Sequence, residues 1–285
     1  MSTALTTLIS VDTLAAEMSN PAFTVIDCRF SLADTTQGEA AFARARIPTA
    51  QYVHLDRDLS SKIVNGVTGR HPLPDAGELE VRFQQLGINN TSQIVVYDDK
   101  AGAIASRFWW LSRWLGHEAC AVLDGGFAAW KKAEYALETH PPKAPLPGHF
   151  IRRDALIASI EKHDVLDQNN LLLDAREAER FAGEHEPIDP VAGHIPGAVN
   201  APFAQNINVD GTFKSKEALR ARFEMLLQNA ESRRLVHYCG SGVTAAHNML
   251  AMCVAGLPPG VMYAGSFSEW VSQNDEQYPV ARLVD

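Results

Sequence analysis

The sequence is short of cysteine and of positive charge, and each shortage excludes a class of protein. Its four cysteines form no Cys-x-x-Cys pair and show no other metal-ligand spacing, so we expect no metal site and no bound cofactor. Four thiols in 285 residues also do not make a disulfide framework. The formal net charge of -9 leaves no basic stripe for phosphate groups, so nucleic acid is not expected as a partner.

Long apolar runs are missing as well. The first residues carry no basic segment and no sustained apolar run, and Asp12 and Glu17 interrupt the next stretch. We therefore expect no signal peptide and no membrane span, with a reducing cytoplasm as the location. An apolar fraction of 46% nevertheless excludes general disorder, so the chain is expected to bury substantial cores.

What the sequence contains is one series of landmarks that occurs twice. An apolar run that closes on Asp-x-Arg at residues 24–29 recurs at 171–176, and residues 46–50 (Arg-Ile-Pro-Thr-Ala) are matched by 194–198 (His-Ile-Pro-Gly-Ala). The apolar run at 94–97 is matched at 235–238, and Gly-x-Phe-x-x-Trp ends each series at Trp130 and Trp270. Because the offset between the copies changes little along the chain, we interpret the pattern as a tandem duplication.

The two copies predict two domains of one fold class. Four prolines between residues 139 and 148 favour stiff, extended backbone, so we place a linker at 139–150, an N-terminal domain at 1–138 and a C-terminal domain at 151–285. Short apolar runs at 25–28, 94–97 and 121–123 alternate with helical patterns such as 103–115. Such alternation predicts an α/β fold, with a parallel sheet flanked by helices in each domain.

Cys239 is the strongest candidate for a catalytic residue. It follows a strand-like run, stands before two glycines, and precedes an alanine-rich helical pattern, which places it at the carboxyl end of a strand. Inward-pointing backbone N–H groups and a helix N-terminus would favour its thiolate form. A small buried structural cysteine is the alternative. The first copy has Asp98 at this position, so only the second can use sulfur chemistry, and the first is free to line the cleft.

These landmarks together resemble the two-domain rhodanese-type sulfurtransferases, across nearly the whole chain. Within that family the loop Cys-Gly-Ser-Gly-Val-Thr at 239–244 is similar to that of 3-mercaptopyruvate sulfurtransferases, whereas thiosulfate sulfurtransferases usually carry Arg-Lys after the cysteine. The resemblance implies transfer of a sulfane sulfur from 3-mercaptopyruvate through a Cys239 persulfide. The acceptor would be cyanide, a small thiol or a reduced thioredoxin-like protein.

The chemistry of the loop agrees with this donor. Sulfite, the leaving group of thiosulfate, calls for cationic residues beside the cysteine, but Gly240 and Ser241 are neutral. Mercaptopyruvate leaves a pyruvate enolate that needs a proton, and the Ser241 hydroxyl suits that task. The alternative for Ser241 is a turn serine that bonds its own backbone.

The resemblance also implies residues outside this loop. His71 would carry protons for Ser241, with Asp56 as its orienting partner, although each is an ordinary loop residue on the sequence alone. Arg180, with Arg176 as second candidate, would bind the substrate carboxylate, or would form surface salt bridges instead. The other predicted substrate-binding positions belong to the loop itself: Gly240, Gly242, Val243 and Thr244.

The chain departs from the family pattern at one place. Family members usually have a further arginine in a Glu-Pro-Arg context, whereas here Ile188 follows Glu-Pro. Arg70 or Arg29 is the candidate to replace it, and the donor preference depends on which residue does so.

Three other functions compete with this interpretation. A thiosulfate sulfurtransferase and a non-enzymatic rhodanese-like module for binding or sulfur sensing stay open, although the presence of Cys239 argues against the second. A cysteine-dependent phosphatase would need an arginine at position 245, and the residue there is Ala245.

Overall fold

The computed structural model describes residues 4–228, 233–273 and 275–283, which form two compact units. The first unit comprises residues up to 61 together with 74–156 and 208–213. The second comprises 62–73, 157–207 and 214 onward. The predicted linker at 139–150, which is described throughout, contains no helix or strand. The segment 62–73 belongs to the second unit, although the residues before and after it belong to the first. Arg70 and His71 are therefore in the same unit as Cys239.

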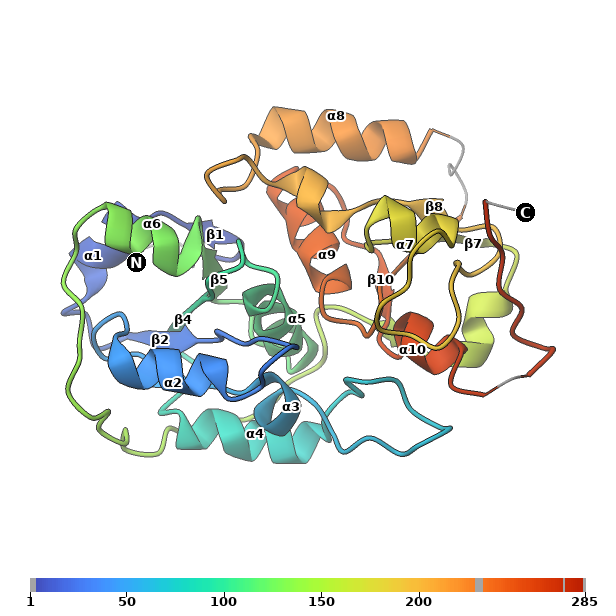
Figure 1. Ribbon diagram of the computed structural model, residues 1–285. Coiled ribbons are helices and arrows are strands. Elements are labelled where there is room, and N and C mark those ends of the chain that lie inside the picture. Colours follow the sequence, from blue (N-terminus) through green and yellow to red (C-terminus); the bar gives the residue numbers. More distant parts are fainter. Residues whose placement is uncertain (1–3, 229–232, 274, 284–285) are drawn as a thin grey trace. The chain divides into compact units, whose positions relative to one another are not determined.

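The first unit is built on a five-stranded, all-parallel sheet of order β1-β5-β4-β2-β3 (Figure 1). Its strands are β1 (Leu8–Ile9), β2 (Phe23–Asp27), β3 (Gln51–Tyr52), β4 (Gln93–Tyr97) and β5 (Cys120–Leu123). Its helices are α1 (Val11–Glu17), α2 (Gln37–Arg44), α3 (Leu55–Asp58), α4 (Ala76–Gln85), α5 (Ala105–Trp114) and α6 (Gly126–Lys132).

Side chains of the central strands alternate between the two faces of this sheet. On one face, Val95 and Tyr97 of β4 pack with residues of α1, α2 and α6. On the other face α5 contacts β4 and β5, and Phe83 of α4 stacks on Phe108 of α5 with ring centroids 5.0 Å apart. Because both faces are covered, β4 is buried along its whole length, which explains its continuous apolar run.

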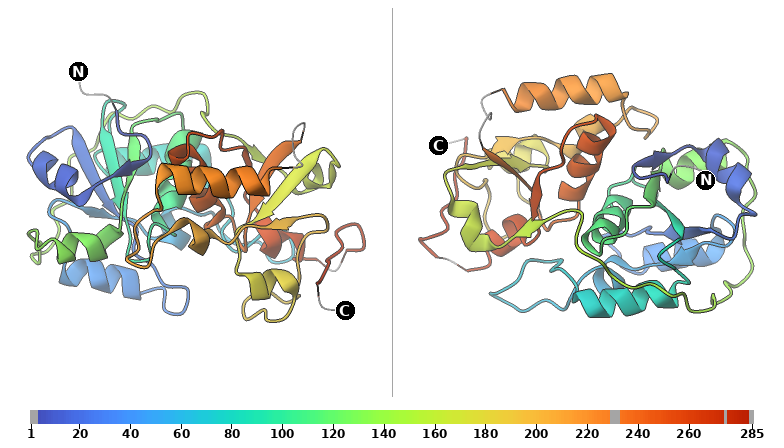
Figure 2. Two further views of the ribbon diagram at one scale, coloured as in Figure 1. Left: turned by 90° about the horizontal axis from the view of Figure 1, so that it is seen from above. Right: turned by 180° about the vertical axis from the view of Figure 1, so that it is seen from behind.

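The second unit repeats the plan with a parallel sheet of order β6-β10-β9-β7-β8. Figure 2 shows the ribbon from two further sides, in the same colours as Figure 1. Its strands are β6 (Ser159–Ile160), β7 (Asn170–Asp174), β8 (Val199–Asn200), β9 (Arg234–Tyr238) and β10 (Val261–Tyr263). Its helices are η1 (Lys162–Leu166), α7 (Ala178–Ala182), η2 (Phe203–Asn206), α8 (Lys216–Leu226), α9 (Ala245–Val254) and α10 (Ser266–Trp270). The predicted fold class, two α/β copies each with a parallel sheet flanked by helices, is therefore confirmed.

The Asp-x-Arg motif forms the same buried ion pair in each unit. Arg29 donates to Asp27 at 2.6 Å through Nη2 and lies over the Phe127 ring at 4.1 Å. Arg176 donates to Asp174 at 2.6 Å through Nη2 and lies over the Phe267 ring at 3.9 Å. The pair occurs with nearly equal geometry in both units, although only the second has a cysteine at the position of Cys239, so it is a shared feature of the two copies.

Asp98 occupies the loop of the first unit that corresponds to the cysteine loop of the second. Its carboxylate is fully buried and accepts backbone N–H groups at 2.8 to 2.9 Å. The donors are Lys100, Gly102, Ile104 and Ala105. This loop therefore satisfies its own inward-pointing amides with an internal anion.

No helix in the described part of the chain is long and apolar enough to cross a membrane.

Candidate active site

Cys239 lies directly after β9, at the carboxyl end of a central strand of the second sheet. Its side chain is almost fully buried, at 2% exposure. Residues 240–244 form the loop that leads into α9, a helix of ten residues whose N-cap residue is Thr244. The predicted order of strand, cysteine loop and helix is thus present. Ala245, where a cysteine-dependent phosphatase would need its arginine, is the buried first residue of α9.

The backbone of Cys239 is fixed by the segment that follows β10. Its N–H donates to Ser266 Oγ at 3.1 Å, and its carbonyl oxygen accepts the N–H of Phe267 at 3.0 Å. The next carbonyl, that of Gly240, accepts the N–H of Ser268 at 2.8 Å. The start of α10 therefore holds the first two residues of the cysteine loop in one conformation.

Ser266 holds this position at a conformational cost. It is fully buried with φ at 56°, in the left-handed region that side chains other than glycine seldom adopt. The matching residue of the first unit is Gly126, whose φ is also 56°. A side chain stands at this strained position only in the unit that carries the cysteine, where its hydroxyl accepts the Cys239 N–H and donates to the Tyr263 carbonyl at 3.0 Å.

Ser241 of the loop is in contact with His71. Ser241 Oγ lies 2.7 Å from His71 Nδ1, and both residues are buried. When Nδ1 carries no proton it accepts the serine hydroxyl, and when it is protonated it donates to the serine oxygen. The pair can therefore pass a proton between a buried hydroxyl and an imidazole.

Two guanidinium groups lie beside Gly240. A Cβ built on this glycine would lie 2.8 Å from Arg70 Nη2 and 3.4 Å from Arg180 Nη2. Burial lowers the pKa of Arg70, and the Cys239 sulfur is the main group that opposes this change. Of the two candidates for the missing arginine, Arg70 is the one located next to the cysteine loop, whereas Arg29 is engaged by Asp27 in the first unit.

A buried carboxylate joins Arg70 and Arg180. Asp189 accepts from Arg70 Nη1 and, at 3.1 Å, from Arg180 Nη2. Arg180 also donates through Nε to Glu186 at 3.0 Å. Both arginines are therefore held by internal anions. Arg70 faces Gly240 with Nη2, which is not the nitrogen bound to Asp189, whereas Arg180 Nη2 both donates to Asp189 and lies near Gly240.

Arg176, the second candidate for carboxylate binding, is engaged elsewhere. Its guanidinium donates to Asp174, to Glu186 at 3.3 Å and to the Gly193 carbonyl at 2.7 Å. Burial acts to lower its pKa, but the charge of Asp174 and their hydrogen bond outweigh burial, so the pKa is raised. Arg29 makes the same Asp-x-Arg ion pair in the first unit, and substrate binding by Arg176 stays a prediction.

The remaining predicted residues lie in two places. Val243 and Thr244 end the cysteine loop, where their carbonyls accept the N–H groups of Ala246 and His247 at 3.2 Å. Asp56 is the second residue of α3 in the first unit, where its N–H donates to His54 Nδ1 at 3.1 Å. Its role as orienting partner of His71 stays a prediction.

Three residues around this loop were not singled out from the sequence: Ser266, Ser268 and Asp189. Ser266 had a visible signal, because it replaces a glycine in the other copy. Ser268 accepts the Arg70 N–H at 3.0 Å and so ties the segment 62–73 to the loop, a contact between residues far apart in the chain. Asp189 is an acidic residue directly after Ile188, the position where the family pattern has an arginine, and this proximity was its signal in the sequence.

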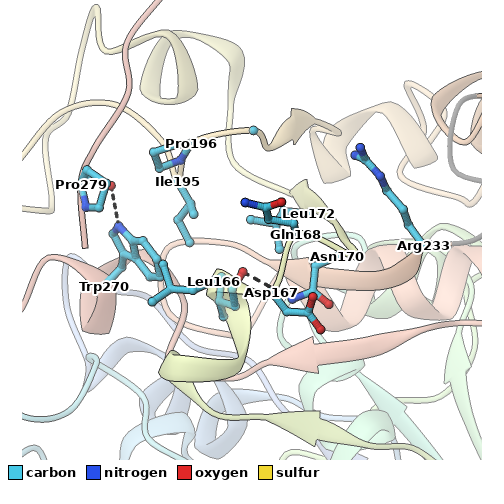
Figure 3. Close-up of a pocket in the computed structure, with 12 residues that line it drawn as sticks. Leu166, Asp167, Gln168, Asn170, Leu172, Ile195, Pro196, Arg233, Trp270 and Pro279 are labelled. Carbon is cyan, nitrogen blue, oxygen red and sulfur yellow. Dashed lines mark hydrogen bonds between the residues drawn. The ribbon is translucent and has the colours of Figure 1, made fainter. Parts of the chain in front are cut away.

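A separate cavity of about 400 Å³ lies in the second unit (Figure 3). Its polar groups serve the fold: Trp270 Nε1 donates to the Pro279 carbonyl at 2.9 Å, and Asn170 Nδ2 donates to the Asp164 carbonyl at 2.8 Å. None of the predicted site residues lines it. Among the described residues there is also no group of three or more His, Cys, Asp or Glu side chains that would hold a metal ion.

Most of the chain matches one known protein family. The family described as rhodanese-like domain matches residues 10–133 and again 154–273. The two matched ranges correspond to the two copies inferred from the sequence.

Individual relatives match along nearly the full length. A Pseudomonas aeruginosa protein named "Probable 3-mercaptopyruvate sulfurtransferase" is 48% identical over 96% of this chain and 97% of its own. The thiosulfate sulfurtransferase of Rattus norvegicus is 32% identical over 88% of this chain and 85% of its own. Among solved structures, the 3-mercaptopyruvate sulfurtransferase from Leishmania major superposes with a TM-score of 0.85 at 30% identity, covering 95% of this chain and 76% of that one.

The conformation of Gly242 gives a prediction for the loop. Gly242 has φ at 75°, and a Cβ there would overlap the carbonyl oxygen of Ala264, whereas Gly197 has φ at 78° with open space around it. We expect Gly197→Ala to cost about 1 kcal/mol of unfolding free energy, and Gly242→Ala about 2 kcal/mol more, because only the second adds a clash to the strained φ. Urea unfolding measures both, and equal losses would contradict the geometry.

Proposed function

The chain belongs to the rhodanese-like family, and we propose that it is a sulfurtransferase that takes sulfur from 3-mercaptopyruvate and passes it on through a Cys239 persulfide. The observation that carries the proposal is the 2.7 Å contact between Ser241 Oγ and His71 Nδ1 beside the cysteine loop. Mercaptopyruvate releases an enolate, which needs a proton relay to become pyruvate. Thiosulfate releases sulfite, which needs no such relay.

In the first half-reaction the Cys239 thiolate attacks the sulfur of mercaptopyruvate. The new S–S bond forms as the C–S bond breaks, and the electron pair of the C–S bond remains on carbon as the enolate of pyruvate. The proton of the donor thiol is transferred to that carbon, with Ser241 and His71 as the relay. The products are a Cys239 persulfide and pyruvate, so atoms and charge balance.

In the second half-reaction an acceptor attacks the outer sulfur of the persulfide. Cyanide leaves as thiocyanate, a small thiol leaves as a persulfide, and Cys239 returns as thiolate in both cases. A reduced thioredoxin-like protein would act as a thiol in the same way. Low exposure of Cys239 favours this scheme, because a shielded persulfide is protected from unspecific thiols.

The donor carboxylate would be bound over Gly240. A planar carboxylate fits the forked donors of Arg70 and Arg180, which approach this glycine from two segments of the chain. The same two cations are the observation that favours thiosulfate as a second candidate donor, since they also suit a small oxyanion. The neutral Gly240 and Ser241 next to the nucleophile favour mercaptopyruvate.

Asp56 is proposed to orient His71, as its place in the family pattern implies. The cytoplasm is the proposed location, because the chemistry needs Cys239 as a thiol and a reducing compartment keeps it in that form.

Steady-state turnover with the two donors tests the function. With cyanide as acceptor, we expect kcat/KM for mercaptopyruvate to exceed that for thiosulfate by about tenfold or more, since only the first donor uses the relay. The Cys239→Ser protein should be inactive with both donors. Equal or greater kcat/KM with thiosulfate would overturn the proposed donor.

Variants of the relay test its role separately. Ser241→Ala and His71→Gln should each lower kcat with mercaptopyruvate by roughly a hundredfold, while thiosulfate turnover changes by less than about threefold. The double variant should be little worse than either single one, because the two groups act as a unit. A parallel fall with both donors would indicate that these residues only support the shape of the loop.

A further inference from the structure

Asp189 is placed where a negative charge acts on the donor site. Its side chain is 1% exposed and bridges Arg70 and Arg180, the two arginines that flank Gly240. The preceding residue, Ile188, is 45% exposed, so of these two neighbours only Asp189 is turned into the protein. A buried charge acts on its surroundings far more strongly than an exposed one.

The charges around Asp189 balance. We define the arginine cluster as three arginines and three buried carboxylates joined by ion pairs: Arg70, Arg176, Arg180, Asp174, Glu186 and Asp189. Asp174 and Glu186 together offset two of the arginines, and Asp189 offsets the third. The cluster is therefore formally neutral, and it would carry one positive charge without Asp189.

The cluster nevertheless keeps hydrogen-bond donors for a ligand. Arg70 Nε is buried and has no acceptor among the described residues, and Arg70 Nη2 lies beside Gly240. The site thus offers directed N–H groups with little surplus positive charge. Such a site binds a singly charged anion with less penalty than a doubly charged one.

We infer that Asp189 is a specificity-determining residue that selects a monoanionic sulfur donor over a dianionic one by neutralising the Arg70–Arg180 pair. Mercaptopyruvate, bound as its thiol, carries one negative charge, whereas thiosulfate carries two. The inference rests on the proposed function, since it concerns which donor reaches Cys239.

The test removes the negative charge of Asp189 and keeps the shape of its side chain. Asp189→Asn still offers an oxygen to one arginine, and we expect it to raise the ratio of kcat/KM for thiosulfate to kcat/KM for mercaptopyruvate by about tenfold. The matched control is Glu177→Gln. The Glu177 carboxylate lies 3.8 Å from Arg180 Nη1, and the Glu177 side chain is 60% exposed. Solvent screens that charge, so the ratio should change by less than about twofold.

A ratio that stays constant in Asp189→Asn, or a parallel loss with both donors, would overturn the inference, because Asp189 would then only position the arginines. If Asp189→Asn does not fold, Arg70→Gln supplies the converse test. That variant lowers the charge of the cluster by one, and the ratio should fall.

A second readout does not depend on turnover. Cys239 is alkylated by anionic iodoacetate and by neutral iodoacetamide, and peptide mass spectrometry follows each reaction. The two alkylation rates show how strongly the site favours an anionic reagent over a neutral one. In Asp189→Asn the ratio of the iodoacetate rate to the iodoacetamide rate should rise about threefold or more. An unchanged ratio contradicts the inference. If the wild-type protein turns over neither donor, the proposed function fails, and the alkylation ratio still decides the effect of Asp189.

Discussion

The site depends on the hydrogen bonds that hold the backbone of Cys239 to the start of α10. The cysteine N–H donates to Ser266 Oγ, and the cysteine carbonyl accepts the Phe267 N–H. These bonds fix the first turn of the loop, and the loop in turn places Ser241 against His71 and Gly240 against Arg70. Ser268 extends the arrangement, because it binds both the Gly240 carbonyl and the Arg70 N–H.

The two copies show how one loop position serves two purposes. In the first unit the Asp98 carboxylate accepts the amides of its own loop, so that loop has no place for an external anion. In the second unit Cys239 stands at the matching position, and a strained serine replaces Gly126 to hold its N–H. The Asp-x-Arg ion pairs, by contrast, have nearly the same geometry in both units.

Much of the fold was predictable because the duplication and the buried parallel strands leave strong patterns. The position of Cys239 after β9 followed from the same patterns, and so did Ser241 beside it. The contacts of Arg176 could not be predicted, because an Asp-x-Arg pair looks the same in sequence whether its guanidinium faces a ligand or an internal carboxylate. Asp189 and Ser268 act through contacts with Arg70, which is distant in the chain, and no local pattern reports such contacts.

The proposed mechanism requires that Cys239 carries the transferred sulfur as a covalent intermediate. Mass spectrometry of the protein after one equivalent of mercaptopyruvate, without acceptor, tests this requirement most directly. We expect a mass gain of one sulfur atom on the peptide that contains Cys239, removal of that sulfur by cyanide, and no gain in Cys239→Ser. Release of pyruvate with no sulfur on Cys239, or with the sulfur on another cysteine, would contradict the mechanism.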